Sequence, residues 1–346
     1  MRDGKNWMHR AVAALVGCSL FLASGVTAYG ASGRGALPET LVPVGHTVGI
    51  KLFSEGVLVV GLSELETAGG TAAPAKEGGL KVGDFILECD DVAVESTEHF
   101  QSIVAAAAGT ETCLTVKRQG KTMDLEVSAV QCEDGAWRLG AWVRDSLAGI
   151  GTMTFYDPAS GTFGALGHGI NDVDTGQLMT LDTGSIMPST VKAVKKGEDG
   201  VPGELRGDFD LQRDLGALYA NTAGGVFGEM PAAAMSLGEP VAVAGRDEVH
   251  TGGAEILSNI SGDQVARYQV EIIKIQDGDT QNFVLRVTDS DLLEATGGIV
   301  QGMSGSPILQ DGKLVGAVTH VMVDDPTRGY GIFIENMLTA AGYGTA

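Results

Sequence analysis

The most informative stretch of this sequence reads Gly302-Met303-Ser304-Gly305-Ser306-Pro307-Ile308. Glycines on both sides of Ser304 predict a tight turn, on which backbone N–H groups can converge on a developing oxyanion. We therefore predict that Ser304 is the nucleophile of a hydrolase. The N–H groups of Gly302, Met303 and Ser304 are its predicted oxyanion hole. The alternative is a serine that only occupies a turn.

The residues that follow this turn predict a β-hairpin. An apolar run at residues 307–309 leads into Asp311-Gly312, and a second apolar run follows at residues 314–318. Two apolar runs joined by a short glycine-containing turn are typical of antiparallel strands. The nucleophile turn would thus lie directly before a hairpin, as in chymotrypsin-like serine peptidases, which this pattern resembles.

A serine hydroxyl needs a general base, and histidine is the usual one. His168 lies between Gly167 and Gly169, directly after the apolar run at residues 163–166. This position at a predicted strand end makes it the preferred base. His320, on the strand that leaves the Ser304 hairpin, is the alternative.

The third group of a catalytic triad would be a carboxylate that orients the imidazole. Asp289 ends an apolar run and precedes Ser304 by fifteen residues, so we predict that it orients His168. Its alternative role is to cap a short helix at residues 291–295. Asp172 and Asp174, which follow His168 closely, are the local competitors.

Residues 41–130 resemble a PDZ domain. The stretch from Glu77 to Asp91 carries the family's turn motif, and residues 100–108 have helical spacing. That helix and a strand edge would form a groove for an extended peptide. We predict peptide contacts at Gly56, Val57 and Leu58; the alternative is a domain that only spaces or restrains the next one.

Residues 135–346 alternate short apolar runs with glycine-rich turns, which predicts a barrel or sandwich. The predicted fold is mainly β: a PDZ domain followed by a chymotrypsin-like peptidase domain with two β-barrels. The sequence has no phosphate-binding glycine loop and no metal-ligand spacing of Cys and His, so no cofactor and no metal are expected.

Charge limits the possible partners. The sequence contains 44 Asp and Glu but only 23 Lys and Arg, a formal net charge of −21. Nucleic-acid binding is therefore not expected, because no basic run exists that could neutralise phosphates.

The N-terminal 40 residues resemble a targeting segment. Arg2, Lys5 and Arg10 precede an uncharged apolar stretch at residues 11–28, with small residues after it that suit cleavage. This pattern predicts a secretory signal or a single N-terminal membrane anchor, and hence an exported protein.

Several segments together resemble the stage IV sporulation protein B peptidases of endospore-forming bacteria; they are residues 163–170, 203–207, 287–308 and 316–321, with residues 325–326 and 329–332 after them. The PDZ-before-peptidase order agrees, and the family's His, Asp and Ser fall on His168, Asp289 and Ser304. The resemblance implies a serine endopeptidase of sporulation signalling in the forespore intermembrane space. Such an enzyme cleaves the extracytoplasmic part of a membrane-bound inhibitor of an intramembrane protease, so that pro-sigma-K is processed, and it cleaves its own N-terminal region.

Two other functions stay open at this point. The chain could be a quality-control peptidase of the cell envelope, or a PDZ-based binding scaffold with an inactive peptidase domain.

Overall fold

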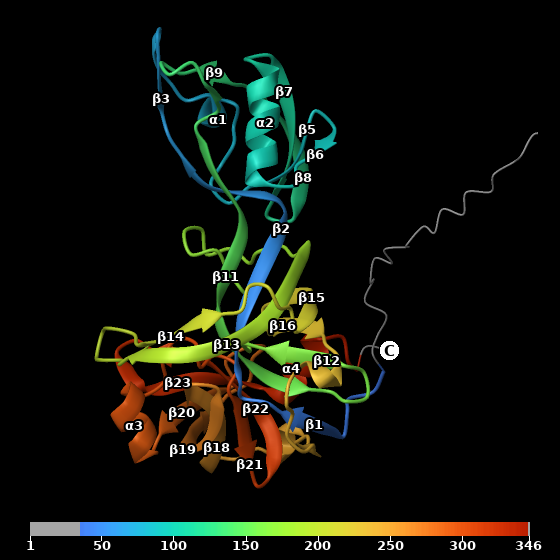
Figure 1. Ribbon diagram of the computed structural model, residues 1–346, viewed down its shortest axis with the longest axis vertical. Coiled ribbons are helices and arrows are strands. Elements are labelled where there is room, and N and C mark those ends of the chain that lie inside the picture. Colours follow the sequence, from blue (N-terminus) through green and yellow to red (C-terminus); the bar gives the residue numbers. More distant parts are fainter. Residues whose placement is uncertain (1–34, 345–346) are drawn as a thin grey trace, which may run out of the picture. The chain divides into compact units, whose positions relative to one another are not determined.

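The computed structural model describes residues 35–344, and its larger part is built from two rings of antiparallel strands (Figure 1). In the first ring each strand pairs with the next, and the last strand returns to the first. The strands of this ring are, in order, β2 (Thr47–Leu62), β11 (Ala141–Tyr156), β12 (Thr162–Ala165), β16 (Gly225–Glu229), β15 (Gly216–Thr222) and β13 (Thr183–Lys195). Three further strands extend it, namely β1 (Thr40–Pro43), β14 (Glu204–Phe209) and β17 (Val241–Ala242).

The second ring is a closed six-stranded barrel. Its strands are, in order of pairing, β18 (Gly252–Ser261), β19 (Gln264–Ile275), β20 (Phe283–Val287), β23 (Asp325–Phe333), β22 (Lys313–Met322) and β21 (Pro307–Gln310). Helix α3 (Ser290–Thr296) follows β20, and helix α4 (Ile334–Ala340) follows β23. The hairpin predicted after Ser304 is the β21–β22 pair.

Each ring encloses its own apolar core. Val48, Met153 and Phe163 are buried inside the first barrel, and Ile272 and Phe283 inside the second. The two predicted β-barrels are therefore confirmed. Strand burial in two separate cores explains why the sequence shows many short apolar runs rather than long ones.

The PDZ part has a third core, formed around Val59, Ile86, Phe100 and Leu114. Its helices are α1 (Pro74–Glu77) and α2 (Thr97–Ala107), close to the helix predicted at residues 100–108. Its strands are the second half of β2, β3 (Leu65–Thr67), β4 (Gly70–Ala72), β5 (Phe85–Cys89), β6 (Val92–Ala93), β7 (Glu111–Arg118), β8 (Lys121–Ser128), β9 (Val130–Gln131), β10 (Trp137–Arg138) and the start of β11.

The boundary expected at residue 41 differs from the structure. Strand β1 pairs with β11, and residues 48–53 of β2 pair with β13, so both belong to the first barrel. Only from Val57 onward does β2 contribute to the PDZ core. The PDZ domain therefore runs from the second half of β2 to the start of β11 and is inserted into the peptidase part; it does not precede that part. Residues before it, among them Val42, Val48 and Ile50, lie in the core of the first barrel.

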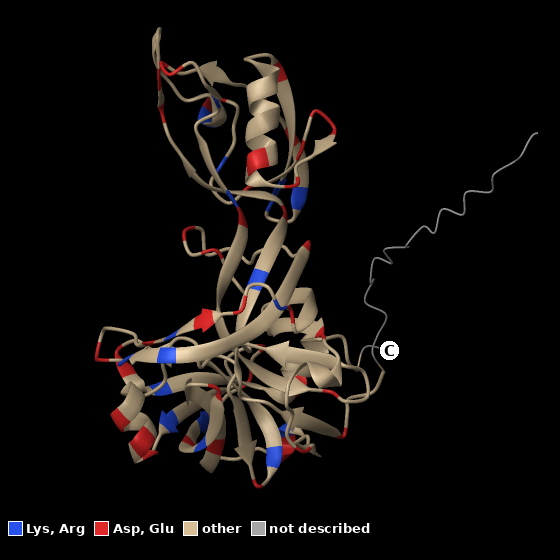
Figure 2. Cartoon of the chain, in the orientation of Figure 1, with Lys and Arg blue, Asp and Glu red and all other residues tan. Residues whose placement is uncertain are grey.

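Charged side chains are spread thinly over the described chain. Figure 2 shows Lys and Arg scattered singly among the more numerous Asp and Glu. No helix within residues 35–344 has the length and apolarity that crossing a membrane would need. The predicted signal or anchor at residues 11–28 lies outside the described residues.

The motif turn of the PDZ part is held by a buried ion pair. Asp84 is completely buried; its carboxylate accepts hydrogen bonds from the Arg118 guanidinium at 2.6 Å and from the Lys81 N–H at 2.8 Å. Arg118 also donates to the Gly79 carbonyl at 2.8 Å, so one side chain ties both ends of the turn to β7.

We predict that Arg118→Ala lowers the free energy of unfolding of the PDZ part by about 3 kcal/mol, because the buried Asp84 carboxylate would lose its countercharge and keep only the Lys81 N–H as a donor. Urea unfolding followed by circular dichroism measures this loss. Arg138→Ala, which breaks an exposed pair with Asp134, is the matched control and should change little. Equal losses in the two variants would contradict the structural role of the buried pair.

Candidate functional site

The turn that carries Ser304 is fastened to the first barrel. Thr152 and Thr154 of β11, both completely buried, donate hydroxyl hydrogen bonds to the carbonyls of Gly302 (2.7 Å) and Gly305 (2.8 Å). The Thr152 N–H donates to the Ser304 carbonyl at 2.9 Å. Strand β11 thus fixes three of the four residues of this turn. Sequence analysis missed this contact, although threonines that alternate with apolar residues at 152–155 are a signal for one polar, buried face.

Glycine is required at both flanks of Ser304. Gly302 and Gly305 have φ angles of +98° and +97°, which side chains rarely adopt. A Cβ atom on Gly305 would lie 1.9 Å from the Thr152 carbonyl oxygen. The glycine pattern that predicted the turn therefore reflects both backbone conformation and close packing against β11.

Two of the three predicted oxyanion-hole donors are available. Among the described residues, the N–H groups of Gly302 and Ser304 have no hydrogen-bond partner, and both residues line the same cleft. The Met303 N–H instead closes the turn by donating to the Val300 carbonyl at 3.1 Å, and Met303 itself is buried. The oxyanion hole predicted at Gly302, Met303 and Ser304 thus reduces to Gly302 and Ser304.

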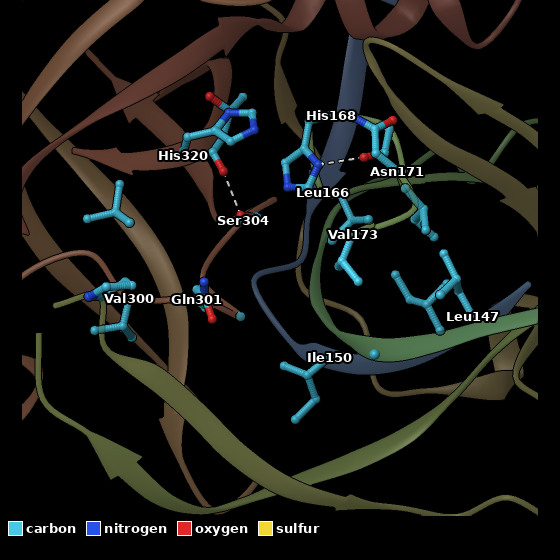
Figure 3. A pocket seen from close by; sticks show the side chains of 18 of the residues that line it. Leu147, Ile150, Leu166, His168, Asn171, Val173, Val300, Gln301, Ser304 and His320 are labelled. Atoms are coloured by element: carbon cyan, nitrogen blue, oxygen red, sulfur yellow. Dashed lines mark hydrogen bonds between the residues drawn. The ribbon is translucent and has the colours of Figure 1, made fainter. Parts of the chain in front are cut away.

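Ser304 and His168 line one cleft of about 500 Å³ (Figure 3). His320 lines it too, so the structure brings the preferred base and its alternative together. The walls are mainly apolar, and none of the described residues that line the cleft is Asp, Glu, Lys or Arg. The titratable groups of the cleft are therefore the two imidazoles.

His168 is held at the end of β12 by an unusual backbone. Leu166 and Gly167 both have φ angles of +69°, so the chain turns sharply before the histidine. A left-handed leucine is rare, and such conformations concentrate at functional sites. The His168 Nδ1 atom lies 2.8 Å from the Gly169 carbonyl oxygen. Because a carbonyl can only accept, Nδ1 must carry the hydrogen and Nε2 keeps the lone pair that a general base needs.

The Ser304 hydroxyl is not hydrogen-bonded to an imidazole in this conformation. It donates to the Thr319 carbonyl at 2.5 Å, one residue before His320 on β22. A rotation about χ1 of Ser304 would release the hydroxyl from this carbonyl. A hydrogen bond from a nucleophilic hydroxyl to its general base is often long or poorly aligned in a free enzyme and tightens only when substrate is bound.

The structure does not place Asp289 in this cleft. Its Oδ1 accepts the N–H groups of Asp291 (3.1 Å) and Leu292 (3.0 Å), and its Oδ2 accepts the Gln269 N–H at 3.1 Å. Asp289 is the N-cap of α3, the alternative role considered for it. Its carboxylate is therefore occupied by backbone donors and is not among the groups that line the cleft.

The local competitors are occupied as well. Asp172 is buried and pairs with the Arg144 guanidinium, which also binds Asp174 at 2.8 Å. Oδ1 of Asp172 accepts N–H groups of its own turn, from Asp174 and Thr175. Within residues 35–344 no carboxylate forms a hydrogen bond or ion pair with His168, whose Nδ1 partner is the Gly169 carbonyl.

With this geometry established, comparison with protein families identifies the chain. The family described as SpoIVB peptidase S55 matches residues 135–338. The chain belongs to the SpoIVB peptidase S55 family. It is accordingly a serine peptidase, and residues 67–118 additionally match the PDZ domain family.

Comparisons with individual proteins give weaker likenesses. The sequence has no significant match among curated proteins. The Rv3671c protease from M. tuberculosis, in its active form, is 16% identical over 58% of this chain and 77% of that chain, with a TM-score of 0.31. The PDZ domain of an SdrC-like protein from Listeria monocytogenes is 21% identical over 26% of this chain and 87% of that one, with a TM-score of 0.21.

In this S55 peptidase, the predicted peptide contacts of the PDZ domain fall on a strand without a free edge. Val57 and Leu58 of β2 pair with β5, and Leu58 also pairs with Arg144 of β11. A Cβ atom on Gly56 would lie 2.2 Å from the Ile86 carbonyl oxygen. Gly56, Val57 and Leu58 are thus inside a sheet, which corrects the prediction that they form the groove wall.

The sheet of the PDZ part has two edge strands, β8 and β11, and the edge near α2 that we consider here is that of β11. In the described chain, residues 141–152 of β11 pair with strand β2 only, and α2 packs near this segment. The Asp145 carboxylate accepts the N–H of Thr97, the first residue of α2, at 2.9 Å. A peptide that adds to the sheet beside α2 would therefore pair with β11. The sequence around residues 54–57 could not reveal this, because the pairing joins segments about 80 residues apart.

We predict that Asp289→Ala lowers the free energy of unfolding by about 1 kcal/mol, as expected for the loss of a helix N-cap. Asp289→Asn should be milder, because asparagine also caps helices. Turnover of the folded variants should stay close to wild type, measured as kcat with a fluorogenic peptide at 25 °C. A drop of several orders of magnitude in Asp289→Asn would instead show that Asp289 orients the base.

The acid limb of the pH profile provides a second test. Burial lowers the pKa of His168 below its usual value of 6.5, and the hydrogen bond to Gly169 offsets only part of this shift. The base is active when neutral, so kcat/KM should persist as the pH falls below 6.5 and decline only at lower pH. A carboxylate partner at Nδ1 would raise the pKa, so a decline that begins above pH 6.5 would contradict this site. His250→Ala, which removes an exposed histidine paired with Asp311, is the control.

Proposed function

We propose that this S55 peptidase is an exported serine endopeptidase in which Ser304 is the nucleophile and His168 the general base. The observation that supports this function is the meeting of Ser304, His168 and two unpaired N–H groups in one cleft. Each group required for acyl transfer is then available from this chain: a nucleophile, a base and an oxyanion hole.

The reaction follows from these positions. Rotation of the Ser304 hydroxyl from the Thr319 carbonyl toward His168 lets Nε2 accept its proton as Oγ attacks the peptide carbonyl. The N–H groups of Gly302 and Ser304 stabilise the oxyanion that forms. The His168 imidazolium then donates its proton to the leaving amine, and water repeats the sequence to release the acyl group.

The cleft favours apolar segments of a polypeptide. Its walls include Leu147, Ile150, Val173, Val300 and Val323. A charged substrate side chain would lose its hydration here and find no countercharge, which costs several kcal/mol. We therefore propose an unfolded or extended polypeptide as substrate, cleaved beside apolar residues.

We further propose a role in sporulation signalling, supported by membership of the S55 family. The substrate would be the extracytoplasmic part of a membrane-bound inhibitor of an intramembrane protease, and its cleavage would permit processing of pro-sigma-K. The peptidase would act in the forespore intermembrane space, where its N-terminal segment would attach it to the membrane.

Self-cleavage of the N-terminal region is part of this proposal. The cut would fall after the apolar stretch at residues 11–28, between about residue 28 and residue 48. Leu41 and Val42 are buried in β1, and β2 begins at Thr47, so cleavage there would require strands to leave the first barrel. Within the described part of this window, cleavage at residues 35–39 is therefore favoured, because these residues lie outside the strands and are mostly exposed.

Ser304→Ala tests the nucleophile and the self-cleavage together. The variant should fold normally, lose labelling by a fluorophosphonate and lose at least about 10⁴-fold in turnover. Purified wild-type protein should shorten at its N-terminus, whereas the variant should stay full length. The control is Ser102→Ala, which changes an exposed serine of α2.

Each outcome separates two explanations. Turnover by folded Ser304→Ala protein would contradict the catalytic assignment. Equal shortening of both proteins would assign the N-terminal cut to another protease. Broad digestion of unfolded casein, in place of a narrow substrate range, would favour envelope quality control over signalling.

A further inference from the structure

The imidazole rings of His168 and His320 pack against each other in the cleft (Figure 3). Their centroids are 4.5 Å apart and their planes are tilted by 33°. His168 follows β12 of the first barrel, and His320 lies on β22 of the second. The contact therefore depends on both barrels, and the proposed mechanism gives His320 no role so far.

His168 lacks the usual carboxylate that fixes an imidazole base. The Gly169 carbonyl determines its tautomer, but a carbonyl is neutral and contacts only one edge of the ring. The ring could still turn about its side-chain bonds. The tilted packing contact with the His320 ring supplies the second restraint, because a packed aromatic neighbour limits these rotations.

The charge state of His320 suits this position. Desolvation in the cleft and the neighbouring His168 together lower the pKa of His320 to about 4, although the residue is exposed to solvent on its other side. His320 is thus neutral at neutral pH. When His168 takes the Ser304 proton it becomes a cation beside a neutral aromatic ring, which attracts it, whereas a charged neighbour would repel it.

We propose that His320 is a positioning residue for His168 and takes the structural place of the missing carboxylate. It packs on the imidazole and holds Nε2 toward Ser304. This inference rests on the proposed function and adds a third side chain to it.

Three substitutions separate packing from charge. His320→Ala removes the ring, His320→Phe keeps an uncharged aromatic ring, and His320→Lys introduces a positive charge. His250→Ala, outside the cleft, is the matched control for loss of a histidine. For each variant we would measure kcat, KM and the pH profile of kcat/KM with a fluorogenic peptide, and thermal unfolding to establish that the protein is folded.

The expected result is a loss in kcat with little change in KM. His320→Ala should lose roughly 10–100-fold in kcat, the scale associated with a misplaced catalytic group. His320→Phe should recover most of this activity. His320→Lys should be slower than His320→Ala, because its charge opposes formation of the imidazolium, and its acid limb should move to lower pH.

Several results would overturn the positioning role. Wild-type kcat in folded His320→Ala protein would show that the contact has no effect. A phenylalanine variant as slow as the alanine variant would show that ring packing is not what matters. Turnover by His168→Ala together with inactivity of His320→Ala would make His320 the base. Failure of wild-type protein to react with a fluorophosphonate would instead contradict the proposed function itself.

Discussion

The hydrogen bonds from Thr152 and Thr154 to the nucleophile turn connect the two barrels at the point where the chemistry would occur. Three donors of one strand hold the carbonyls of Gly302, Ser304 and Gly305. With these carbonyls fixed toward β11, the N–H groups of Gly302 and Ser304 have no hydrogen-bond partner among residues 35–344. Buried, satisfied hydrogen bonds of this kind specify one backbone conformation, because any other would leave polar groups unpaired. The oxyanion hole thus depends on a strand of the opposite barrel.

The same strand also belongs to the PDZ domain. Strand β11 pairs with β2 from Ala141 to Thr152, and β2 contributes Val48 and Ile50 to the first barrel but Val57 and Val59 to the PDZ core. Two long strands are therefore shared by a binding domain and a catalytic domain. Residues 141–144 of β11 form the free edge beside α2, whereas residues 147–150 line the catalytic cleft. A strand with this double use gives the inserted domain a covalent and hydrogen-bonded connection to the site.

Within the part of the chain that the structure describes, no carboxylate contacts His168, the proposed base. Asp289 caps α3, and Asp172 is neutralised by Arg144. The imidazole of His168 relies on a backbone carbonyl for its tautomer and on the His320 ring for packing. Such a site favours a neutral base in an apolar cleft, since burial disfavours the imidazolium. The hydrogen bond from the Ser304 hydroxyl to the Thr319 carbonyl occupies the proposed nucleophile, so its hydroxyl would have to rotate before it could donate to the proposed base.

The sequence by itself determined the local features of this protein. Glycines at 302 and 305 indicated the turn because their backbone conformations exclude other residues, and the apolar runs after it indicated the β21–β22 hairpin. Gly167 and Gly169 likewise indicated the strand end at His168. Only the tertiary structure decided which distant groups meet: that Asp289 does not line the cleft of His168, that β11 and not residues 56–58 carries the PDZ edge near α2, and that His320 packs on His168. Local patterns predict these features because the backbone conformation and the burial of a residue depend largely on that residue and its neighbours in the sequence. Pairings across 80 to 150 residues depend on strand register and barrel closure, and no short stretch of sequence contains them.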